Sequence, residues 1–349
     1  MIRICGSLQA AGYSVLLIGR KKKTSLPLEQ RAFAQKRLSC FFEKGKLFYL
    51  EYNTRLFLFL LFQPFDVVCG IDLDTLLPAL WVARLKQKKC TYDAHEYFTE
   101  VPEVVHRPFT KKVWSILARY AIPRVDAAYT VCHSLADIFY KKYGLPFEVI
   151  RNVPFRKNTD FAYAKSENKK VLLYQGVLNV GRGLPQLIEA MQEIDDAVLY
   201  LAGEGDLSTE LRRQVQALGL SHKVKFLGYL RPAELTKATA IAYIGLNFLE
   251  NKGLSYYYSL ANKTFDYIQW QVPAIHMDFP EYRILNEQYQ VAVLIPDLKK
   301  DTICSAIKTL LQDKSLYQKL KANTQTARLT YHWENEEKKL LSIYQKLNK

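Results

Sequence analysis

Two short segments in the second half of the chain combine a cation with the start of a predicted helix. The first, residues 174–184, runs from a strand through Gly176, Gly181 and Gly183 into a helical pattern, and it carries Arg182. Glycines let a backbone approach a phosphate closely, helix N-termini present free N–H groups, and a guanidinium suits phosphate oxygens. The segment therefore favours a phosphate site, although a left-handed turn followed by a surface arginine fits the same residues.

In the second segment, residues 256–268, the turn-prone Asn262 comes before another helical pattern. This pattern places Lys263 near a helix N-terminus, where its ammonium can meet a phosphate, and Asp266 one turn later, where it can accept hydrogen bonds from a sugar diol. The alternative is a capped helix whose lysine and aspartate are solvated, because acids are favoured in a first turn in any case.

One histidine in the first half stands where ligands bind in open sheets. His95 follows the predicted strand 90–93 and precedes a polar loop, and open parallel sheets bind ligands at the carboxyl ends of their strands. We expect His95 to meet a reacting hydroxyl or a sugar, with Glu96 and Glu100 as lesser candidates. A structural histidine bonded to a neighbouring group is the alternative. No ligand spacing typical of a metal site accompanies it, and we expect no metal.

The elements that position these residues alternate between short strands and helices, which predicts parallel sheets built from βαβ units. The predicted strands are 14–19, 66–70, 90–93, 127–131, 171–174, 197–202, 224–226, 241–248, 274–277 and 291–295. A polar stretch without apolar periodicity, 151–170, predicts a linker. We therefore expect two Rossmann-like domains, 1–155 and 165–330, with a C-terminal helix, 333–349, that packs back on the first.

The composition limits the classes of partner. With 49 basic and 34 acidic residues, the formal charge of +15 suits nucleic acid, an anionic membrane or phosphorylated small molecules. The basic residues are spread along the chain and no nucleic-acid-binding motif appears, so we expect no nucleic-acid partner. No signal peptide is evident, and the apolar segment 56–62 is shorter than the ~20 residues that span a bilayer. We expect a cytoplasmic protein with reduced cysteines.

The order of these motifs resembles the retaining GT-B glycosyltransferases of the family 4 type, the glycosyl transferases group 1. The shared features are a glycine loop with a basic residue (Gly176, Arg182), a Gly-x-Gly turn (203–205) and a glycine before a base-contacting loop (228–230). The last shared feature is a segment in which the family normally has two glutamates separated by seven residues. The resemblance covers nearly the whole chain and is strongest over 171–280. It implies two facing Rossmann-like domains with parallel sheets.

The resemblance also implies a role for each matching residue. Arg182 and Lys263 would hold the diphosphate of a nucleotide-sugar donor and stabilise it as it leaves, Asp266 would grip the ribose, and His95 would lie near the donor sugar. The remaining donor-site residues implied are Gly176, Gly203, Tyr229, Tyr258, Ser259 and Leu260. Tyr258 stands where the family places its first glutamate, and Val177 where many members place another arginine. These departures leave the sugar open.

The implied activity is that of a metal-independent hexosyl- or other glycosyltransferase without a resident cofactor. It would transfer a sugar with retention to a saccharide or lipid-linked acceptor, in cell-surface polysaccharide or glycolipid synthesis. The family normally has a strand and a glycine loop before the helix at 2–11, so we expect the first domain to lack its first strand. That leaves an alternative, a catalytically impaired nucleotide- or polyanion-binding protein on a truncated GT-B scaffold. An epimerase or phosphorylase is a smaller rival.

Basic and apolar residues of the first domain raise the question of membrane contact. Arg20 to Lys23, Arg55 beside the apolar segment 56–62, and Lys111-Lys112 near Trp114 would suit the inner face of an anionic membrane. Solvated lysines and a core helix explain the same residues, so peripheral association stays open at this point.

Overall fold

The computed structural model describes residues 1–157 and 169–347, which form two compact units. Unit 1 comprises residues 1–151 and 335–349, and unit 2 comprises residues 152–334. We had predicted domains of 1–155 and 165–330. Part of the predicted linker, 158–168, and the chain end, 348–349, lie outside the described residues.

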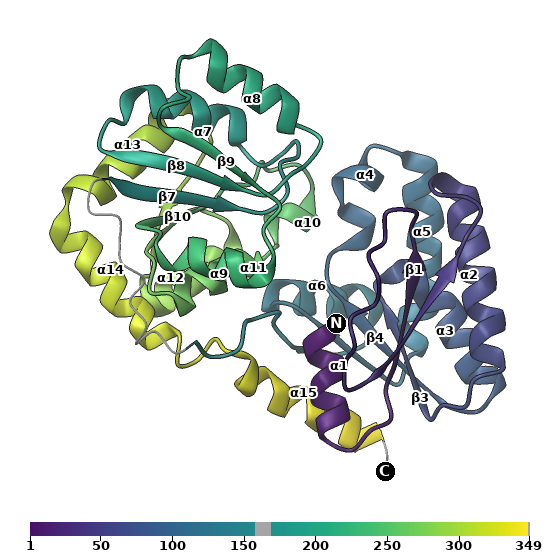
Figure 1. Cartoon of the computed structure of the whole chain (residues 1–349). Coiled ribbons are helices and arrows are strands. Elements are labelled where there is room, and N and C mark those ends of the chain that lie inside the picture. Colours follow the sequence, from purple (N-terminus) through teal and green to yellow (C-terminus); the bar gives the residue numbers. More distant parts are fainter. Residues whose placement is uncertain (158–168, 348–349) are drawn as a thin grey trace. The chain divides into compact units, whose positions relative to one another are not determined.

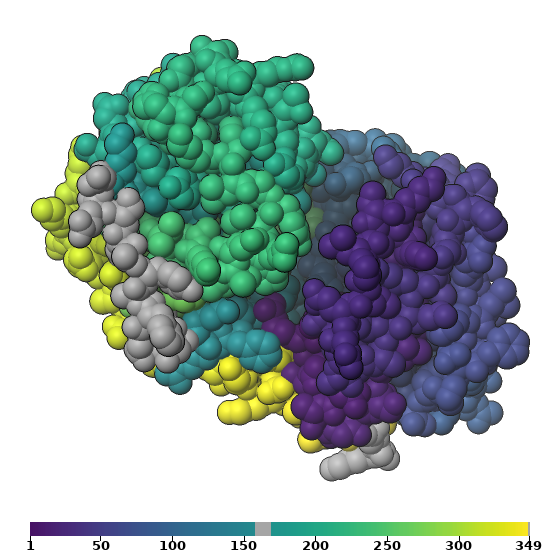
Figure 2. Space-filling model, viewed as in Figure 1, coloured from purple at the N-terminus to yellow at the C-terminus, as the bar shows by residue number. Residues whose placement is uncertain are grey.

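Unit 1 contains two parallel sheets flanked by helices (Figure 1). The first sheet pairs β1 (Leu16–Lys21) with β2 (Ala34–Ser39), and the second has the order β3-β4-β5-β6. The strands of the second sheet are β3 (Val67–Ile71), β4 (Lys89–Ala94), β5 (Ala127–Thr130) and β6 (Phe147–Val149). The first described element is a helix, and the absence of a first strand stays a prediction. The segment from the N-terminus to the end of β2, which is purple in the space-filling view, lies at the surface (Figure 2).

The helices of unit 1 cover its sheets because each buries one apolar face. They are α1 (Ile2–Ala10), α2 (Gly45–Leu61), α3 (Leu73–Leu85), α4 (Pro102–Val105), α5 (Pro108–Ala121), α6 (His133–Tyr143) and the greater part of α15 (Trp333–Leu347). Within this unit α3 packs on β3 and β4, and α2 and α5 both pack on α3. In α15 the Tyr344 hydroxyl lies 3.4 Å from that of Tyr129, which ties the C-terminal helix to β5.

Unit 2 is a six-stranded parallel sheet of order β12-β11-β10-β7-β8-β9 with helices on both faces (Figure 1). Its strands are β7 (Lys170–Gln175), β8 (Ala197–Ala202), β9 (Val224–Gly228), β10 (Ile244–Asn247), β11 (Ala274–Met277) and β12 (Ala292–Ile295). Its helices are α7 (Leu184–Ala190), α8 (Ser208–Ala217), α9 (Pro232–Ala240), α10 (Leu254–Tyr257), α11 (Asn262–Gln269), α12 (Pro280–Tyr289), α13 (Lys300–Gln312) and α14 (Lys314–Ala327).

The central strands of unit 2 are apolar on both faces, as a sheet covered by two helical layers requires. Leu172, Leu199 and Leu246 are fully buried. Every strand predicted from the sequence forms within a few residues, whereas β2 and β6 were not predicted. Short 3-10 turns occur at Phe98–Glu100, Ile122–Arg124 and Met191–Glu193. No helix in the described part of the chain has the length and apolarity to cross a bilayer.

Candidate functional site

The carboxyl ends of β7 and β8 expose bare backbone at the edge of the unit 2 sheet. Gly176 follows β7 with φ +135° and Gly203 follows β8 with φ +148°, conformations that side chains other than hydrogen rarely permit. The amide of Gly176 donates to the carbonyl of Ala202 at 2.9 Å, and a Cβ on Gly203 would overlap the carbonyl oxygen of Gly176. The two glycines therefore allow neighbouring loops to touch, and they leave room for a ligand to approach the backbone.

Lys263 reaches back from the first turn of α11 over this glycine edge. Its Nζ lies 3.9 Å from the centroid of the Tyr174 ring, and a Cβ on Gly176 would stand 3.3 Å from the same atom. Burial, together with the charge of Arg182, places the pKa of Lys263 well below its ordinary value. No carboxylate in the described part of the chain pairs with it. Lys263 is therefore not the solvated lysine of the simpler alternative, but a desolvated amine whose charged form has no counter-ion among the described residues.

Arg182 lies near Lys263 and also rests on an aromatic ring. Its Cζ is 5.0 Å from the centroid of the Tyr256 ring, and its buried Nε has no hydrogen-bond partner among the described residues. Helix α7 begins at Leu184, and Pro185 in its first turn has no N–H to offer. The guanidinium can therefore offer donors to an anion here, whereas the first turn of α7 has one backbone donor fewer because of Pro185.

The N-terminus of α11 offers backbone donors beside Lys263. The amide of Ala261 donates to the Tyr282 hydroxyl at 3.0 Å, while the amides of Asn262 and Lys263 have no backbone acceptor in the described chain. Because the first N–H groups of a helix lack partners within the helix, these two amides favour an anion at this point.

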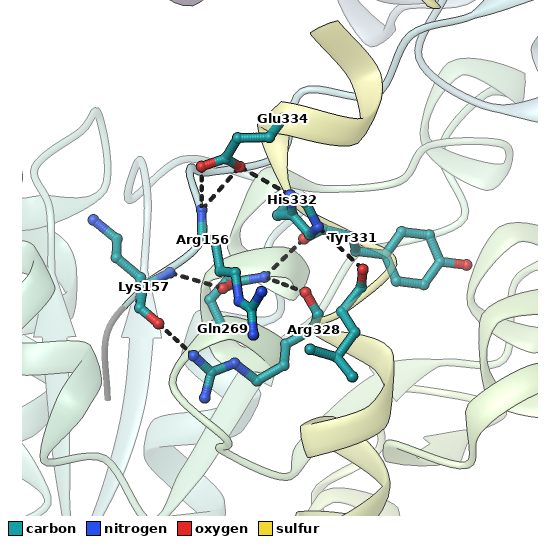
Figure 3. A network of polar contacts seen from close by, with 8 residues as sticks. Arg156, Lys157, Gln269, Arg328, Tyr331, His332 and Glu334 are labelled. Atoms are coloured by element: carbon teal, nitrogen blue, oxygen red, sulfur yellow. Dashed lines mark hydrogen bonds and ion pairs between the residues drawn. The ribbon is translucent and has the colours of Figure 1, made fainter. Parts of the chain in front are cut away.

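Packing and a polar network hold α11 in this position. A Cβ on Gly245 would collide with the ring of Tyr267, so the helix lies close to β10, and the Tyr267 hydroxyl donates to the carbonyl of Leu173 at 2.9 Å. At the C-terminal end of α11, buried Gln269 donates to the carbonyls of Arg328 and Tyr331 at 3.0 and 2.9 Å (Figure 3). Together with the bond from Ala261 to Tyr282 at its N-terminal end, these contacts hold the first turn of the helix in a fixed place.

The same network connects residues 152–157 to the rest of unit 2. The amide of Lys157 donates to Gln269 Oε1 at 3.1 Å, and the Arg156 amide donates to Glu334 Oε2 at 3.2 Å (Figure 3). Arg328 also donates to the carbonyl of Lys157. These contacts explain why unit 2 begins at Asn152, near the start of the predicted linker, rather than at its end.

The other predicted donor residues lie at the same edge with varied surroundings. Asp266 accepts a hydrogen bond from Gln175 Nε2 at 2.8 Å, and the Ser259 hydroxyl donates to the Tyr256 carbonyl at 2.8 Å. Leu260 is buried, and the Tyr258 ring packs against Tyr257 with centroids 5.0 Å apart. Tyr229 is 79% exposed after β9, two strands away from β7. Its side chain is not held beside Arg182 or Lys263 by any contact found among the described residues.

A buried histidine beneath Lys263 was not predicted from the sequence. Both ring nitrogens of His276 lack hydrogen-bond partners among the described residues, as does Oδ1 of Asn247 on the neighbouring strand. Burial, and then the charge of Lys263, lowers the pKa of His276 to about 3, so the ring is neutral. His276 lies within the apolar run of β11, which gave no sign of a polar role. Tyr174 and Tyr256 were missed for the same reason.

In unit 1, His95 belongs to an acidic cluster at the carboxyl ends of β3 and β4. Its Nε2 lies 3.1 Å from Oδ2 of Asp93, and its amide donates to Asp72 Oδ1 at 2.8 Å. Burial opposes protonation, but the close contact with Asp93 and the charges of Asp93 and Asp72 raise the pKa of His95 overall. Burial also raises the pKa of Asp72 to about 6 and that of Glu96 to about 7. The cluster can hold or move a proton near neutral pH.

The lesser candidate Glu100 is occupied structurally, since its Oε1 pairs with Lys111 Nζ at 2.7 Å. Asp72 and Asp93 were not assigned a role from the sequence, although each occurs at a strand end. Among residues 1–157 and 169–347, no three His, Cys, Asp or Glu side chains gather as a group that could hold a metal ion.

Comparison with known proteins finds matches to both halves of the chain. Residues 155–327 match the family described as glycosyl transferases group 1, and residues 1–154 match glycosyltransferase family 4. The alpha-D-kanosaminyltransferase of Streptomyces kanamyceticus is 19% identical over 244 residues, which cover 65% of this chain and 62% of that protein. The chain spans less than two thirds of the length of the curated relatives that it matches.

Solved structures share the fold. Sucrose-phosphate synthase from Thermosynechococcus elongatus superimposes with a TM-score of 0.79 at 17% identity, covering 99% of this chain and 92% of that one. HepE of Anabaena, in complex with UDP and glucose, gives a TM-score of 0.73 at 15% identity, covering 90% and 86%. These likenesses confirm the predicted fold class, GT-B with parallel sheets in two Rossmann-like domains.

Proposed function

Because the chain belongs to the group 1 glycosyltransferases, we propose that it transfers a sugar, with retention, from a nucleoside-diphosphate sugar to a saccharide or lipid-linked acceptor. The observation that carries this proposal is the pair of basic side chains, Arg182 and Lys263, which lie on aromatic rings above a glycine edge and have no carboxylate partner among the described residues. A diphosphate would supply the missing counter-charge. That HepE was solved with UDP supports a nucleotide as the ligand of this fold.

In the proposed complex each donor group has one task. The diphosphate lies between Arg182 and Lys263, where the free amides at the start of α11 add backbone donors. The ribose hydroxyls lie at Asp266, and the donor sugar lies near Tyr258, Ser259 and Leu260. Gly176 and Gly203 leave space for the phosphates, and Tyr229 is available to the base.

The proposed chemistry needs no resident cofactor. The bond between the anomeric carbon and the leaving oxygen breaks, and its electron pair stays with the departing diphosphate. Arg182 and Lys263 stabilise the negative charge that develops there, so we propose that no divalent metal is required. The acceptor oxygen bonds to the anomeric carbon on the same face, and its proton passes to the leaving diphosphate.

Unit 1 is proposed to supply the acceptor side, with His95 contacting a sugar or the reacting hydroxyl. The raised pKa of this histidine, which Asp93 helps to cause, means that it donates hydrogen bonds through a larger part of the neutral range. We place the reaction in the cytoplasm, at the inner face of an anionic membrane, in the synthesis of a cell-surface polysaccharide or glycolipid.

Several of the basic side chains that could contact a membrane already have partners within unit 1. Arg55 pairs with Glu51 at 2.8 Å, Lys111 pairs with Glu100, and Arg20 rests on the Phe48 ring at 3.9 Å. Apolar side chains of α2 remain open to solvent nearby, with Phe62 just beyond its end 79% exposed.

Thermal-shift screening against UDP-, GDP- and ADP-sugars tests the donor site. We expect at least one nucleoside diphosphate to raise the melting temperature, and Arg182→Ala to abolish this rise. A second assay follows release of the nucleoside diphosphate from its sugar in the presence of acceptor. Binding without any release would favour the impaired binding protein instead, and a screen in which no nucleotide shifts the midpoint would refute the site assignment.

A further inference from the structure

An apolar groove lies in unit 1 between three helices. One face each of α2, α3 and α5 encloses a cavity of about 630 Å³, a size that suits a small organic ligand. Helix α3 forms the floor, since α2 and α5 both pack on it, and the other two helices form the walls. Residues that represent the three helices are Tyr49, Leu50, Leu77, Trp81, Val113 and Trp114.

The walls are mainly apolar, and the uncharged polar side chains in the lining are Asn53, Thr54 and Thr110. Asn53 donates to the carbonyl of Tyr49, and the Thr54 hydroxyl donates to that of Leu50, both at 2.8 Å within α2. One donor of Asn53 and the donor of Thr54 are therefore satisfied without a ligand. The groove thus offers mainly hydrocarbon contacts along its length.

Helix α2 is apolar on two sides, and unit 1 covers only one of them. Tyr52, Leu56 and Leu60 face the core, whereas Leu50, which lines the groove, is 67% exposed. Across the groove, Phe109 of α5 is also 67% exposed, and Trp81 of α3 is 46% exposed. Large exposed apolar patches of this kind mark interaction surfaces.

Contacts across the groove at one end limit the shape of what can enter. The Tyr49 and Trp114 rings meet with centroids 5.5 Å apart, which joins the wall of α2 to that of α5. Lys46 Nζ also lies 4.7 Å from the centroid of the Phe109 ring, again from one wall to the other. A helix with its side chains is about 10–12 Å across and needs an open trough. A single hydrocarbon chain is thin enough for a slot that is closed at one end.

The charges at the groove are mostly positive. Lys46 and Arg107 line it, and neither pairs with a carboxylate among the described residues. The acid that lines it is Asp74, whose pKa is raised to about 6 by burial and by the neighbouring Asp72. Cations beside an apolar slot complement a ligand with a negative head and a long apolar tail.

We propose that this groove holds one hydrocarbon chain of an anionic, phosphate-bearing lipid taken from a bilayer, with Lys46 and Arg107 at the phosphate. Binding of the chain is independent of the donor site. The consequence of this lipid binding for catalysis rests on the proposed function, because a lipid held in the groove would favour a lipid-linked acceptor over a free saccharide.

Quenching of tryptophan fluorescence by vesicles with brominated acyl chains tests this inference directly. Trp81 and Trp114 line the groove, so phosphatidylglycerol vesicles with brominated chains should quench the fluorescence of the full chain. We expect Trp81→Phe to remove much of this quenching. Leu50→Asp puts a charge into the apolar wall and should weaken vesicle binding about tenfold or more, whereas Leu58→Asp, on the same helix but outside the groove, should not.

A second pair of variants covers the case in which Leu50→Asp does not fold. Val113→Asp should weaken binding and Ile116→Asp should not, because both residues are on α5 but only Val113 lines the groove. Equal effects within either pair, or vesicle binding without quenching, would show surface contact only and overturn the inference. So would a dimer, detected by analytical ultracentrifugation, that Leu50→Asp dissociates.

The wild-type protein is also titrated with the nucleoside diphosphate. Quenching without a nucleotide-induced thermal shift would support the groove and count against the proposed function, whereas the converse would overturn the groove alone.

Discussion

Replacing Lys263 by methionine should leave the free protein at least as stable and should remove most of its response to nucleotide. The methionine keeps a long apolar side chain against the Tyr174 ring, and it removes an ammonium whose pKa is lowered by burial and by Arg182. A lysine whose folded pKa lies below its unfolded one destabilises the native state at every pH below the unfolded pKa, because burial opposes its charged form. The lost cation–π contact opposes this gain by about 0.5–2 kcal/mol. We therefore expect the free variant to be at least as stable as the wild type.

The effect on ligand binding has the opposite sign and is larger. A hydrogen bond to a charged group contributes about 1.5–3 kcal/mol, so losing it should weaken nucleoside-diphosphate binding roughly ten- to 150-fold. At a ligand concentration of about 100 times the wild-type Kd, ligand stabilisation is about 2.7 kcal/mol, and a 100-fold weaker Kd leaves about 0.4 kcal/mol. For a domain of this size the midpoint shift should fall from about 5–10 °C to below about 2 °C.

Differential scanning fluorimetry measures both effects on one sample, and isothermal titration calorimetry gives the Kd. Lys237→Met is the matched control, because Lys237 is an exposed lysine of α9 in the same unit. It should change neither the midpoint nor the Kd. A Lys263→Met protein that loses stability but still binds the nucleotide with wild-type affinity would refute our account of this lysine.

Three further predictions follow from the same structure. Lys263 should take up a proton when the nucleotide binds, so the affinity for nucleotide should fall as the pH rises above the lowered pKa of this lysine. Calorimetry in buffers of different ionisation enthalpy would detect the proton uptake, and binding without proton uptake would contradict the prediction. Gly203→Ala should cost about 3 kcal/mol or more in urea unfolding, because its Cβ overlaps the backbone of Gly176, whereas Gly219→Ala, which also has a positive φ but open space, should cost about 1–2 kcal/mol. The free energy of unfolding of unit 1 should fall between about pH 5 and pH 8. Four groups have folded pKa values above their unfolded ones, so the stability that they contribute at low pH is lost as the pH rises through the folded values; they are Asp72, Asp74, Glu96 and His95. A free energy of unfolding that rises over this range would contradict the prediction.

The sequence predicted most strands of the fold because each combines an apolar run with a clear end. It missed β2, whose residues Gln35, Lys36 and Arg37 are polar and whose stability comes from pairing with β1 in parallel. It also missed β6, which has only three residues. Both depend on a neighbouring strand, and that contact is not local in the sequence.

The donor site could be predicted only in part for a similar physical reason. Glycines and cations at the ends of strands and the starts of helices identified Gly176, Arg182 and Lys263. The rings that support the two cations, Tyr174 and Tyr256, lie in apolar or aromatic runs and resemble ordinary core residues. Their role depends on which strand ends lie side by side, and that is decided by the sheet order.

The central claim is that Arg182 and Lys263 hold the diphosphate of the donor. A crystal structure of the full chain with the nucleoside diphosphate that gives the largest thermal shift tests it most directly. We predict diphosphate oxygens within hydrogen-bond distance of the Arg182 guanidinium and the Lys263 ammonium, with the ribose at Asp266. A nucleotide bound elsewhere, while Arg182 stays on the Tyr256 ring and Lys263 on the Tyr174 ring, would contradict the account.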